Sequence, residues 1–310
     1  MKENFLMGVF KGKKPMTLNE KLKKLENILN GYGQMIVAFS GGVDSTFLLA
    51  FAYELWGDDR VAACTASGPH FARDEIDYAR DVCDRLGISH KSIDVSHVMD
   101  IIRDNPEDRC YHCKKEIFGA LKMRAEMVGS VLADGTNADD MLDYRPGYRA
   151  ITELGVASPL KEAGLTKAEI RQALEELADS DEKIKAALIS HAPEDAGRMI
   201  WEKPAFACLA SRVPYGEAIT EEKLSAIYSA ESYIRSNGFS QVRVRCHEIA
   251  DGERLLARIE LIPDEIPKFR DEYLKGAVET LKTLGFEEVI LDSEGYVKGK
   301  LNGELQPTGV

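Results

Sequence analysis

The sequence predicts an α/β protein in which a parallel sheet covered by helices is followed by a smaller α+β domain. Three observations support this prediction. Strand-like and helix-like runs alternate over the first half of the chain, a glycine turn joins the first strand to a long helix, and the order of elements changes after about residue 200. A chain of 310 residues is long enough to bury two hydrophobic cores.

The first domain is expected to span residues 1–200. Its short apolar or β-branched runs predict strands, and the amphipathic stretches between them predict helices. We expect strands at residues 36–39, 61–66, 90–95 and 130–134, and helices at residues 46–56, 73–86 and 114–128. In an open sheet of this kind, ligands bind beyond the carboxyl ends of the strands.

A helical stretch closes the first domain. Thr166, followed three residues later by Glu169, forms a capping box that starts a helix. The more polar residues 179–198 predict a second, peripheral helix as an insertion. Residues 201–300 then predict the small α+β domain, and residues 301–310 a loose tail. In this domain we expect helices at residues 220–236 and 267–284, and strands at residues 241–247, 255–261 and 288–291.

The composition is typical of a soluble globular protein, with 44% hydrophobic and 30% charged residues. The formal net charge of −12 argues against a broad nucleic-acid surface, because the phosphate backbone requires clustered positive charge. The apolar runs are too short to span a membrane, and the N-terminal residues lack the apolar centre of a secretory signal. We therefore expect a cytoplasmic protein without membrane or nucleic-acid partners.

The turn between the first strand and the first helix is the most informative stretch. It consists of Ser40, Gly41, Gly42, Val43, Asp44 and Ser45. The glycines allow a sharp turn and close approach to a ligand, and the N–H groups at the start of the helix favour an anion. Asp44 can hold Mg²⁺ against phosphate oxygens. The lysine of a Walker A loop is missing, and SGGVDS instead resembles the pyrophosphate loop of the ATP pyrophosphatases, which implies ATP as the ligand. An ordinary Ser/Gly turn is the alternative.

Two further strand ends would line the same crevice and could hold adenosine. The residues concerned are Thr65, Ser67, Gly135 and Thr136. The alternative is that both segments are only connections between elements.

Three of the six cysteines form the second signal. Cys110 and Cys113 make a CxxC pair flanked by basic residues, and Cys208 lies in an irregular segment far along the chain. Such thiolates can bind one metal or cluster and leave a position open for chemistry. A redox disulfide, a zinc site that recruits His112, and chance spacing are the alternatives. The other three cysteines, Cys64, Cys83 and Cys246, fit buried apolar positions.

Arg243 and Arg245 are spaced two residues apart on a predicted strand and therefore share one face. Paired guanidinium groups suit phosphate or carboxylate, whereas a solvated strand face is the alternative.

Several motifs occur in one order along the chain, and together they identify a family resemblance. They are SGGVDSTFLL, NPEDRCYHCK, LADGTNADD, SPLKEAGLTKAEIR, WEKPAFACLASRVPYG and QVRVR. The chain resembles the LarE family of ATP-dependent sulfur transferases, which build the nickel-pincer nucleotide cofactor of lactate racemase. The resemblance implies an adenine-nucleotide α-hydrolase-like (PP-loop) domain and then a smaller domain that helps to build the sulfur-transfer site and a homo-oligomer.

The resemblance also implies a substrate and a mechanism. A carboxylate of pyridinium-3,5-biscarboxylic acid mononucleotide attacks the α-phosphate of ATP, with Mg²⁺ near Asp44, and a sulfur nucleophile then displaces AMP. Family members with one cysteine, at the place of Cys208, give up its sulfur. Members with three hold a [4Fe–4S] cluster that carries an extra sulfide, and Cys110, Cys113 and Cys208 match this type. The substrate phosphate is expected to bind Ser211, Arg212, Arg243 and Arg245.

Partners and rivals follow from this interpretation. A sulfide donor or a nickel-inserting protein would act beside the enzyme. The rival functions are a tRNA thiolase, an amide-forming ligase of the NAD or GMP synthetase type, and a nucleotide-binding regulator with structural zinc. Residues 179–198 depart from the family pattern, in which the capped helix reaches the Trp-x-Lys-Pro segment more directly.

Overall fold

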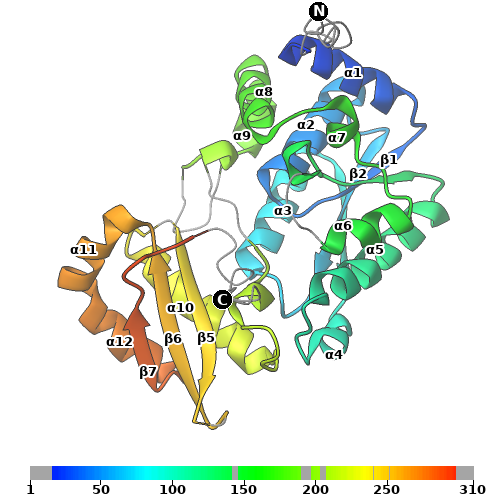
Figure 1. Ribbon diagram of the computed structural model, residues 1–310. Coiled ribbons are helices and arrows are strands. Elements are labelled where there is room, and N and C mark those ends of the chain that lie inside the picture. Colours follow the sequence, from blue (N-terminus) through cyan, green and yellow to red (C-terminus); the bar gives the residue numbers. More distant parts are fainter. Residues whose placement is uncertain are drawn as a thin grey trace, which may run out of the picture.

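The computed structural model describes residues 16–141, 146–189, 197–202, 207–239, 241–250 and 252–297. The described chain forms one region around a four-stranded parallel sheet and a second around a three-stranded mixed sheet (Figure 1). This confirms the predicted fold class, whereas the boundary near residue 200 stays a prediction. None of the described helices has the length and apolar character needed to cross a membrane.

The first sheet has the strand order β3-β2-β1-β4 with all pairs parallel. Its strands are β1 (Met35–Ala38), β2 (Val61–Ser67), β3 (Ser89–Asp94) and β4 (Val131–Ala133). In the register of the sheet, Met35 lies opposite Val61 on one side and Val131 on the other. Since neighbours flank β1 on both edges, the strand lies in the centre of the sheet and its carboxyl end is where a ligand is expected.

Helices cover both faces of this sheet, as the alternation of strands and helices predicts. Along β1, Met35 and Val37 pack into one core with α2 and α3, whereas Ile36 packs into the opposite core with α5. The helices of this region are α1 (Leu18–Asn30), α2 (Val43–Trp56), α3 (Arg73–Leu86), α4 (Val98–Ile102), α5 (Arg109–Met127), α6 (Pro146–Glu153), α7 (Pro159–Ala163), α8 (Lys167–Ser180) and α9 (Glu182–Ala187).

Two predicted helices differ from the observed ones. Helix α5 begins at Arg109 rather than at residue 114, so the CxxC pair lies inside the helix and not on a turn before it. In the 179–198 segment, α9 is short and is not merely peripheral, because Ile184 and Ala187 are fully buried. It packs against α3, where Lys183 donates a hydrogen bond to the Leu86 carbonyl. Residues 190–196 of this stretch lie outside the described residues.

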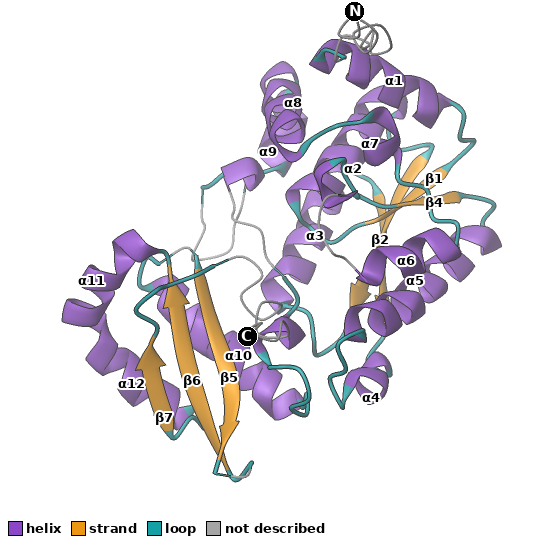
Figure 2. Cartoon of the chain, viewed as in Figure 1, coloured by secondary structure: helices purple, strands orange, loops and turns teal. Residues whose placement is uncertain are grey.

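The second region places helices on one face of a mixed sheet (Figure 2). Strands β5 and β6 pair antiparallel, and β6 and β7 pair parallel. The strands are β5 (Val242–Ile249), β6 (Arg254–Leu261) and β7 (Glu288–Leu291), and the helices are α10 (Glu221–Ser236), α11 (Ile266–Lys268) and α12 (Leu274–Thr283), with a π-helical turn at Phe269–Tyr273 between the last two. Helix α10 packs along β5 and carries Glu231, which is described below.

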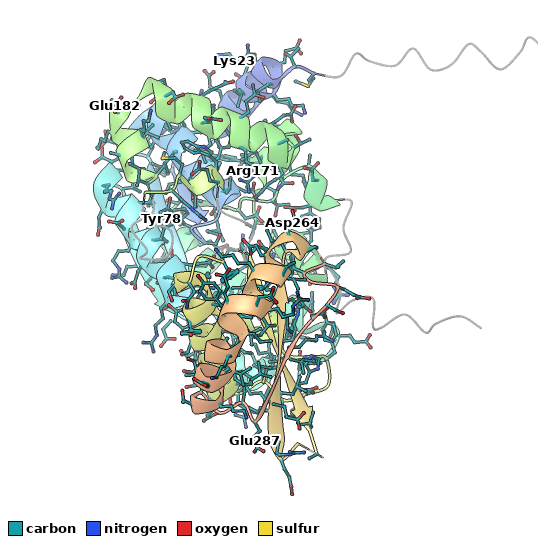
Figure 3. All side chains as sticks on the ribbon, turned by 90° about the vertical axis from the view of Figure 1, so that its left-hand side faces the viewer. Lys23, Tyr78, Arg171, Glu182, Asp264 and Glu287 are labelled. Atoms are coloured by element: carbon teal, nitrogen blue, oxygen red, sulfur yellow. The ribbon has the colours of Figure 1, made fainter. Side chains whose placement is uncertain are left out.

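One hydrophobic core joins the two regions. It runs from Ile36 and Leu132 beneath the parallel sheet, through Leu209, to Val244 and Ile259 in the second sheet. The end of β6 that leads to Asp264 is turned toward the first region, whereas Glu287 lies at the far end (Figure 3). The first residues of β5 pair with the last residues of β6, so they also lie at the end nearest the first region.

Candidate functional site

The predicted phosphate loop lies between β1 and α2, at the carboxyl end of the central strand. Gly41 has φ +71°, and an added Cβ would lie 3.1 Å from the Glu75 carbonyl oxygen. Only glycine fits this position without strain. The Ser45 hydroxyl donates to the Gly42 carbonyl over 3.1 Å and lies 3.2 Å from the Ser40 hydroxyl. The loop is therefore held closed around the N-terminus of α2, whose first amides have no intrahelical acceptor.

The segment after β4 closes one side of this loop. A Cβ on Gly135 would lie 2.7 Å from the Ser45 amide nitrogen and 3.1 Å from the Asp44 carbonyl carbon. The backbones touch here, so this segment lines the same crevice as the loop, whereas contact of Gly135 and Thr136 with adenosine stays a prediction. Thr136 is nearly buried and donates its hydroxyl to Asp134, which also accepts from Ser158 at 2.7 Å. The Thr136 side chain thus secures the segment.

The two hydroxyl groups predicted on β2 also make contacts within the sheet. Thr65 donates to the Phe39 carbonyl over 2.8 Å and its oxygen lies 2.8 Å from the His90 Nε2. Ser67 donates to the Ile93 carbonyl over 3.3 Å. These bonds tie β2 to β1 and β3, and contact of these residues with adenosine stays a prediction.

Asp44, in the first turn of α2, pairs with a lysine that the sequence analysis did not single out. The Nζ of Lys167, the first residue of α8, lies 2.5 Å from the Asp44 Oδ2. Burial raises the pKa of Asp44 above its usual value, Lys167 opposes this, and nearby Asp140 adds to it. The other oxygen, Asp44 Oδ1, is buried without a hydrogen-bond partner in the described part of the chain.

These groups fit a divalent cation. A buried carboxylate oxygen without a donor, with a second carboxylate nearby, offers the hard oxygen ligands that Mg²⁺ prefers. Asp139 belongs to the same corner, since its Oδ2 accepts the Lys167 amide over 2.8 Å. The signals that could have identified these residues are the two aspartates that end LADGTNADD and the lysine that follows the Thr166 cap.

The three predicted cysteines converge. Cys110 and Cys113 lie in the first turns of α5, and Cys208 directly precedes the 3-10 helix Leu209–Arg212. Burial raises the pKa of the Cys113 thiol to about 12, and the neighbouring Cys208 and Cys110 add to this rise. The positive charge of Arg109 lowers this pKa in part. All three thiols are free of disulfides. Cys208 therefore lies close to the CxxC pair although about a hundred residues separate them in the chain.

The cysteines lie at the same edge of the sheet as the phosphate loop. Helix α5 is followed by β4, which is parallel to β1, so α5 runs against the strands and begins at their carboxyl edge. Among the described residues, no group of three or more His, Cys, Asp or Glu side chains has the spacing expected for a metal ion. The cysteines predicted to be structural, Cys64, Cys83 and Cys246, are all buried.

The four predicted phosphate-binding residues also come together. Arg245 Nη1 donates to the Ser211 carbonyl over 2.7 Å, and Arg212 Nη1 lies 3.1 Å from the Ser211 hydroxyl. Arg243 and Arg245 are only 4% and 5% exposed, so they do not form a solvated strand face. The pKa of Arg243 falls to about 10, first through burial and then through repulsion from Arg212.

Two buried glutamates that the sequence analysis missed hold these arginines. Arg212 and Glu231 form a two-pronged ion pair of 2.9 and 3.0 Å, and both side chains are fully buried. Arg245 pairs with Glu260 at 3.0 Å. Burial would raise the pKa of Glu231, but Arg212, Arg243 and the Val244 amide together lower it. Glu231 lies ten or more residues from each arginine in sequence, so only the fold reveals the pair.

The parallel sheet, its glycine loop and the acidic corner beside it define a nucleotide-binding enzyme. A family model described as NAD synthase matches residues 17–135, which contain that loop. The chain is 40% identical over 288 residues to the Uncharacterized protein slr1717 of Synechocystis sp., covering 91% of this chain and 98% of that protein. It is 33% identical over 291 residues to the pyridinium-3,5-bisthiocarboxylic acid mononucleotide synthase of Lactiplantibacillus plantarum, covering 93% and 96%.

A more distant relative is the Uncharacterized protein MJ0830 of Methanocaldococcus jannaschii, 28% identical over 285 residues, covering 91% of this chain and 99% of that protein. The chain belongs to the PP-loop ATP pyrophosphatase family and is similar over nearly its whole length to a LarE-type synthase.

Proposed function

We propose that this chain is an ATP-dependent sulfur transferase that converts the carboxylates of pyridinium-3,5-biscarboxylic acid mononucleotide to thiocarboxylates. The printed name of the L. plantarum relative motivates the choice of product. The observation that supports the proposal most is the convergence of Cys110, Cys113 and Cys208 at the edge of the sheet where the phosphate loop lies. An ATP pyrophosphatase that only joins ammonia to an adenylate has no use for three thiols at that position.

The first half-reaction belongs to the phosphate loop. Its amides and the N-terminus of α2 would hold the phosphates, and Asp44 with Asp140 would hold Mg²⁺. A substrate carboxylate oxygen attacks the α-phosphorus, and the bond to the bridging oxygen breaks to release pyrophosphate. Lys167 would place a positive charge near the departing pyrophosphate and so stabilise its negative charge.

The second region would bind the substrate phosphate through Ser211, Arg212, Arg243 and Arg245. Glu231 anchors Arg212 and Glu260 anchors Arg245, so these ion pairs fix the orientation of both guanidinium groups. The N-terminal part of β5 lies at the end of its sheet nearest the first region, and Arg212 Nη1 donates to the Cys208 carbonyl over 3.0 Å.

The three cysteines would hold a [4Fe–4S] cluster. Burial and the two neighbouring cysteines raise the pKa of the Cys113 thiol, and a bound cationic group would favour its thiolate form. When bound, such a cluster would supply a sulfide from the iron that has no cysteine ligand. Arg109 and Lys114 oppose the rise in the pKa of Cys113 and thus favour the ligating form.

The remaining expectations are part of the same proposal. They are a first domain at residues 1–200 and a second at residues 201–300, a homo-oligomer, a cytoplasmic location, and a partner that donates sulfide or inserts nickel.

The proposal is tested with protein purified without oxygen, MgATP, the biscarboxylate nucleotide and sulfide. We expect release of pyrophosphate that depends on the nucleotide, and a product in which sulfur replaces carboxylate oxygen, both seen by mass spectrometry and phosphate analysis. Iron and sulfide quantification reports the cluster separately. Amide formed from ammonia, or ATP turnover that requires tRNA, would contradict the proposal.

Substrate and ATP binding are expected to depend on different residues. Arg243→Gln should weaken binding of the biscarboxylate nucleotide by about tenfold or more, because a charge-assisted hydrogen bond contributes roughly 1.5–3 kcal/mol, and should leave ATP affinity unchanged. Arg270→Gln, at an exposed arginine of the same region, is the matched control. An equal loss of both ligands in Arg243→Gln would remove Arg243 from the phosphate site.

A further inference from the structure

Asn105 has an unusual backbone conformation beside the cysteines. Its φ is +50°, and of the described residues other than glycine only Ala250 is also positive. Side chains with a Cβ rarely adopt this conformation, although asparagine tolerates it better than most. Asn105 is also fully buried. A strained and buried position of this kind persists only where the surrounding contacts hold it.

Three of the hydrogen bonds of Asn105 lead to the segment that follows Cys208. The Asn105 amide nitrogen Nδ2 donates to the Val213 carbonyl over 3.2 Å and to the Pro214 carbonyl over 2.5 Å. The Asn105 carbonyl accepts the Gly216 amide over 3.0 Å. One residue of the first region thus binds three backbone groups of a segment about a hundred residues away.

Arg109 makes the second half of the connection. It is 4% exposed, and its Nη1 donates to the Ala210 carbonyl over 2.9 Å and to the Asn105 side-chain oxygen. Its guanidinium group lies over the Tyr215 ring, 5.3 Å from the ring centre. Arg109 therefore links Asn105 to both ends of the segment from Ala210 to Tyr215.

The contacts of Asn105 and Arg109 lie close in sequence to the cysteines. Arg109 immediately precedes Cys110, and Ala210 lies two residues after Cys208. The Leu209 amide is bound in addition by the His70 carbonyl at 3.1 Å. Only a few rotatable bonds separate the Arg109–Ala210 and Leu209–His70 hydrogen bonds from the thiols. These hydrogen bonds therefore limit the distance between the Cys208 thiol and the CxxC pair.

We propose that Asn105 and Arg109 are positioning residues that hold Cys208 beside Cys110 and Cys113. We call the pair the Asn105–Arg109 clamp. Its use in sulfur transfer rests on the proposed function, but its geometric effect does not. The clamp brings together thiols from two distant parts of the chain.

The test measures the distance between thiols rather than activity. Dibromobimane becomes fluorescent when it joins two nearby thiols. In a Cys110→Ser parent it should therefore join Cys113 to Cys208, as mapped by mass spectrometry on the full chain without metal. Asn105→Gly keeps the positive φ and removes only the side chain. In this variant we expect the cross-link yield to fall about tenfold or more, because the three hydrogen bonds of the buried Asn105 side chain are lost together.

Three controls make the result specific. Arg109→Lys keeps the charge but loses the planar fork, and should also lower the yield. Arg103→Ala removes an exposed arginine of the same segment and should not. Monobromobimane, which labels single thiols, corrects for reactivity, and unchanged ATP affinity shows that the first region is folded.

The outcomes separate the clamp from the proposed function. Parental cross-link yields in both Asn105→Gly and Arg109→Lys would overturn the clamp and leave sulfur transfer standing. No Cys113–Cys208 cross-link in the parent would overturn the clamp together with the three-cysteine site. A clamp-dependent cross-link in a protein that does not transfer sulfur would support the clamp alone.

Discussion

The phosphate loop and the cysteine–arginine junction lie in the same molecule but are built in opposite ways. The loop takes its shape mainly from the consecutive residues 40–45, with contacts from Glu75, Gly135 and Lys167 around it. The junction assembles residues 105–113 with residues 208–216 and with side chains from the second sheet and α10. Local conformation therefore determines the first site, whereas long-range buried contacts determine the second.

This difference determines which kind of substitution should disturb each site. In the loop, the critical quantity is the space around the backbone, since two segments touch there with no side chain between them. In the junction, the critical quantity is charge balance, since carboxylates such as Glu231 are fully buried opposite arginines. The following predictions test this division, beginning with the largest effect.

Removing one member of the buried ion pair should have the largest effect on stability. Arg212→Ala leaves the fully buried Glu231 without its main partner, and we expect the free energy of unfolding to fall by about 3–5 kcal/mol in urea. Arg80→Ala breaks an exposed pair with Asp77 and should change it by only about 0–1 kcal/mol. Similar losses in the two variants would refute the claim that the junction depends on buried charge.

Adding one methyl group to the loop should have a smaller effect on stability but a clear effect on ATP. Gly135→Ala places a Cβ 2.7 Å from the Ser45 nitrogen, so the backbone must shift, at a cost of roughly 1–3 kcal/mol. We expect ATP affinity, measured by calorimetry, to fall about tenfold because the loop amides move.

The matched control for this substitution lies in α5. A Cβ on Gly119 meets no atom within 4 Å, and alanine is favoured over glycine inside a helix by up to about 1 kcal/mol. Gly119→Ala should therefore leave ATP affinity unchanged and stabilise the chain slightly. If Gly135→Ala binds ATP as tightly as Gly119→Ala does, ATP binding does not depend on the close backbone contact between Gly135 and the loop.

Much of the fold could be predicted from the sequence because it is encoded in local patterns. The alternation around β1, the capping box at Thr166 and the glycine turn each act within a few residues, and all are observed. The errors concern places where tertiary contacts override local pattern. Helix α5 begins at Arg109, after Asp108 at the N-cap position, and Arg109 is held there by contacts with Asn105 and with the distant Ala210 carbonyl.

The candidate site divides in the same way. The phosphate loop and the identities of the cysteines and arginines follow from motifs, whereas their partners do not. Glu231 belongs to a helix whose sequence gives no sign that it is fully buried, and Lys167 reads as an ordinary helix-starting residue. A charged residue is usually exposed, so its burial opposite an arginine can be recognised only when the fold brings the two together.

The ion pair between Lys167 and Asp44 should have the smallest effect on stability and a distinctive pH dependence. The pair is partly exposed, so Lys167→Ala should change the free energy of unfolding by only about 0–1 kcal/mol. The pKa of Asp44 is raised, and hence the folded chain holds this proton more tightly than the unfolded chain. The stability from this group is present below the unfolded pKa and is lost as pH rises through the folded pKa.

Lys167 lowers the pKa of Asp44, so Lys167→Ala should raise that pKa further and extend the loss of stability to higher pH. In urea unfolding curves, the difference between Lys167→Ala and the parent should grow as the pH rises through the folded-state pKa of Asp44. In an Asp44→Asn background, where no carboxylate titrates, the same substitution should give a difference that does not vary with pH. A pH-dependent difference that persists in that background would assign the effect to a group other than Asp44, and the acidic corner would then lose its main argument for holding Mg²⁺.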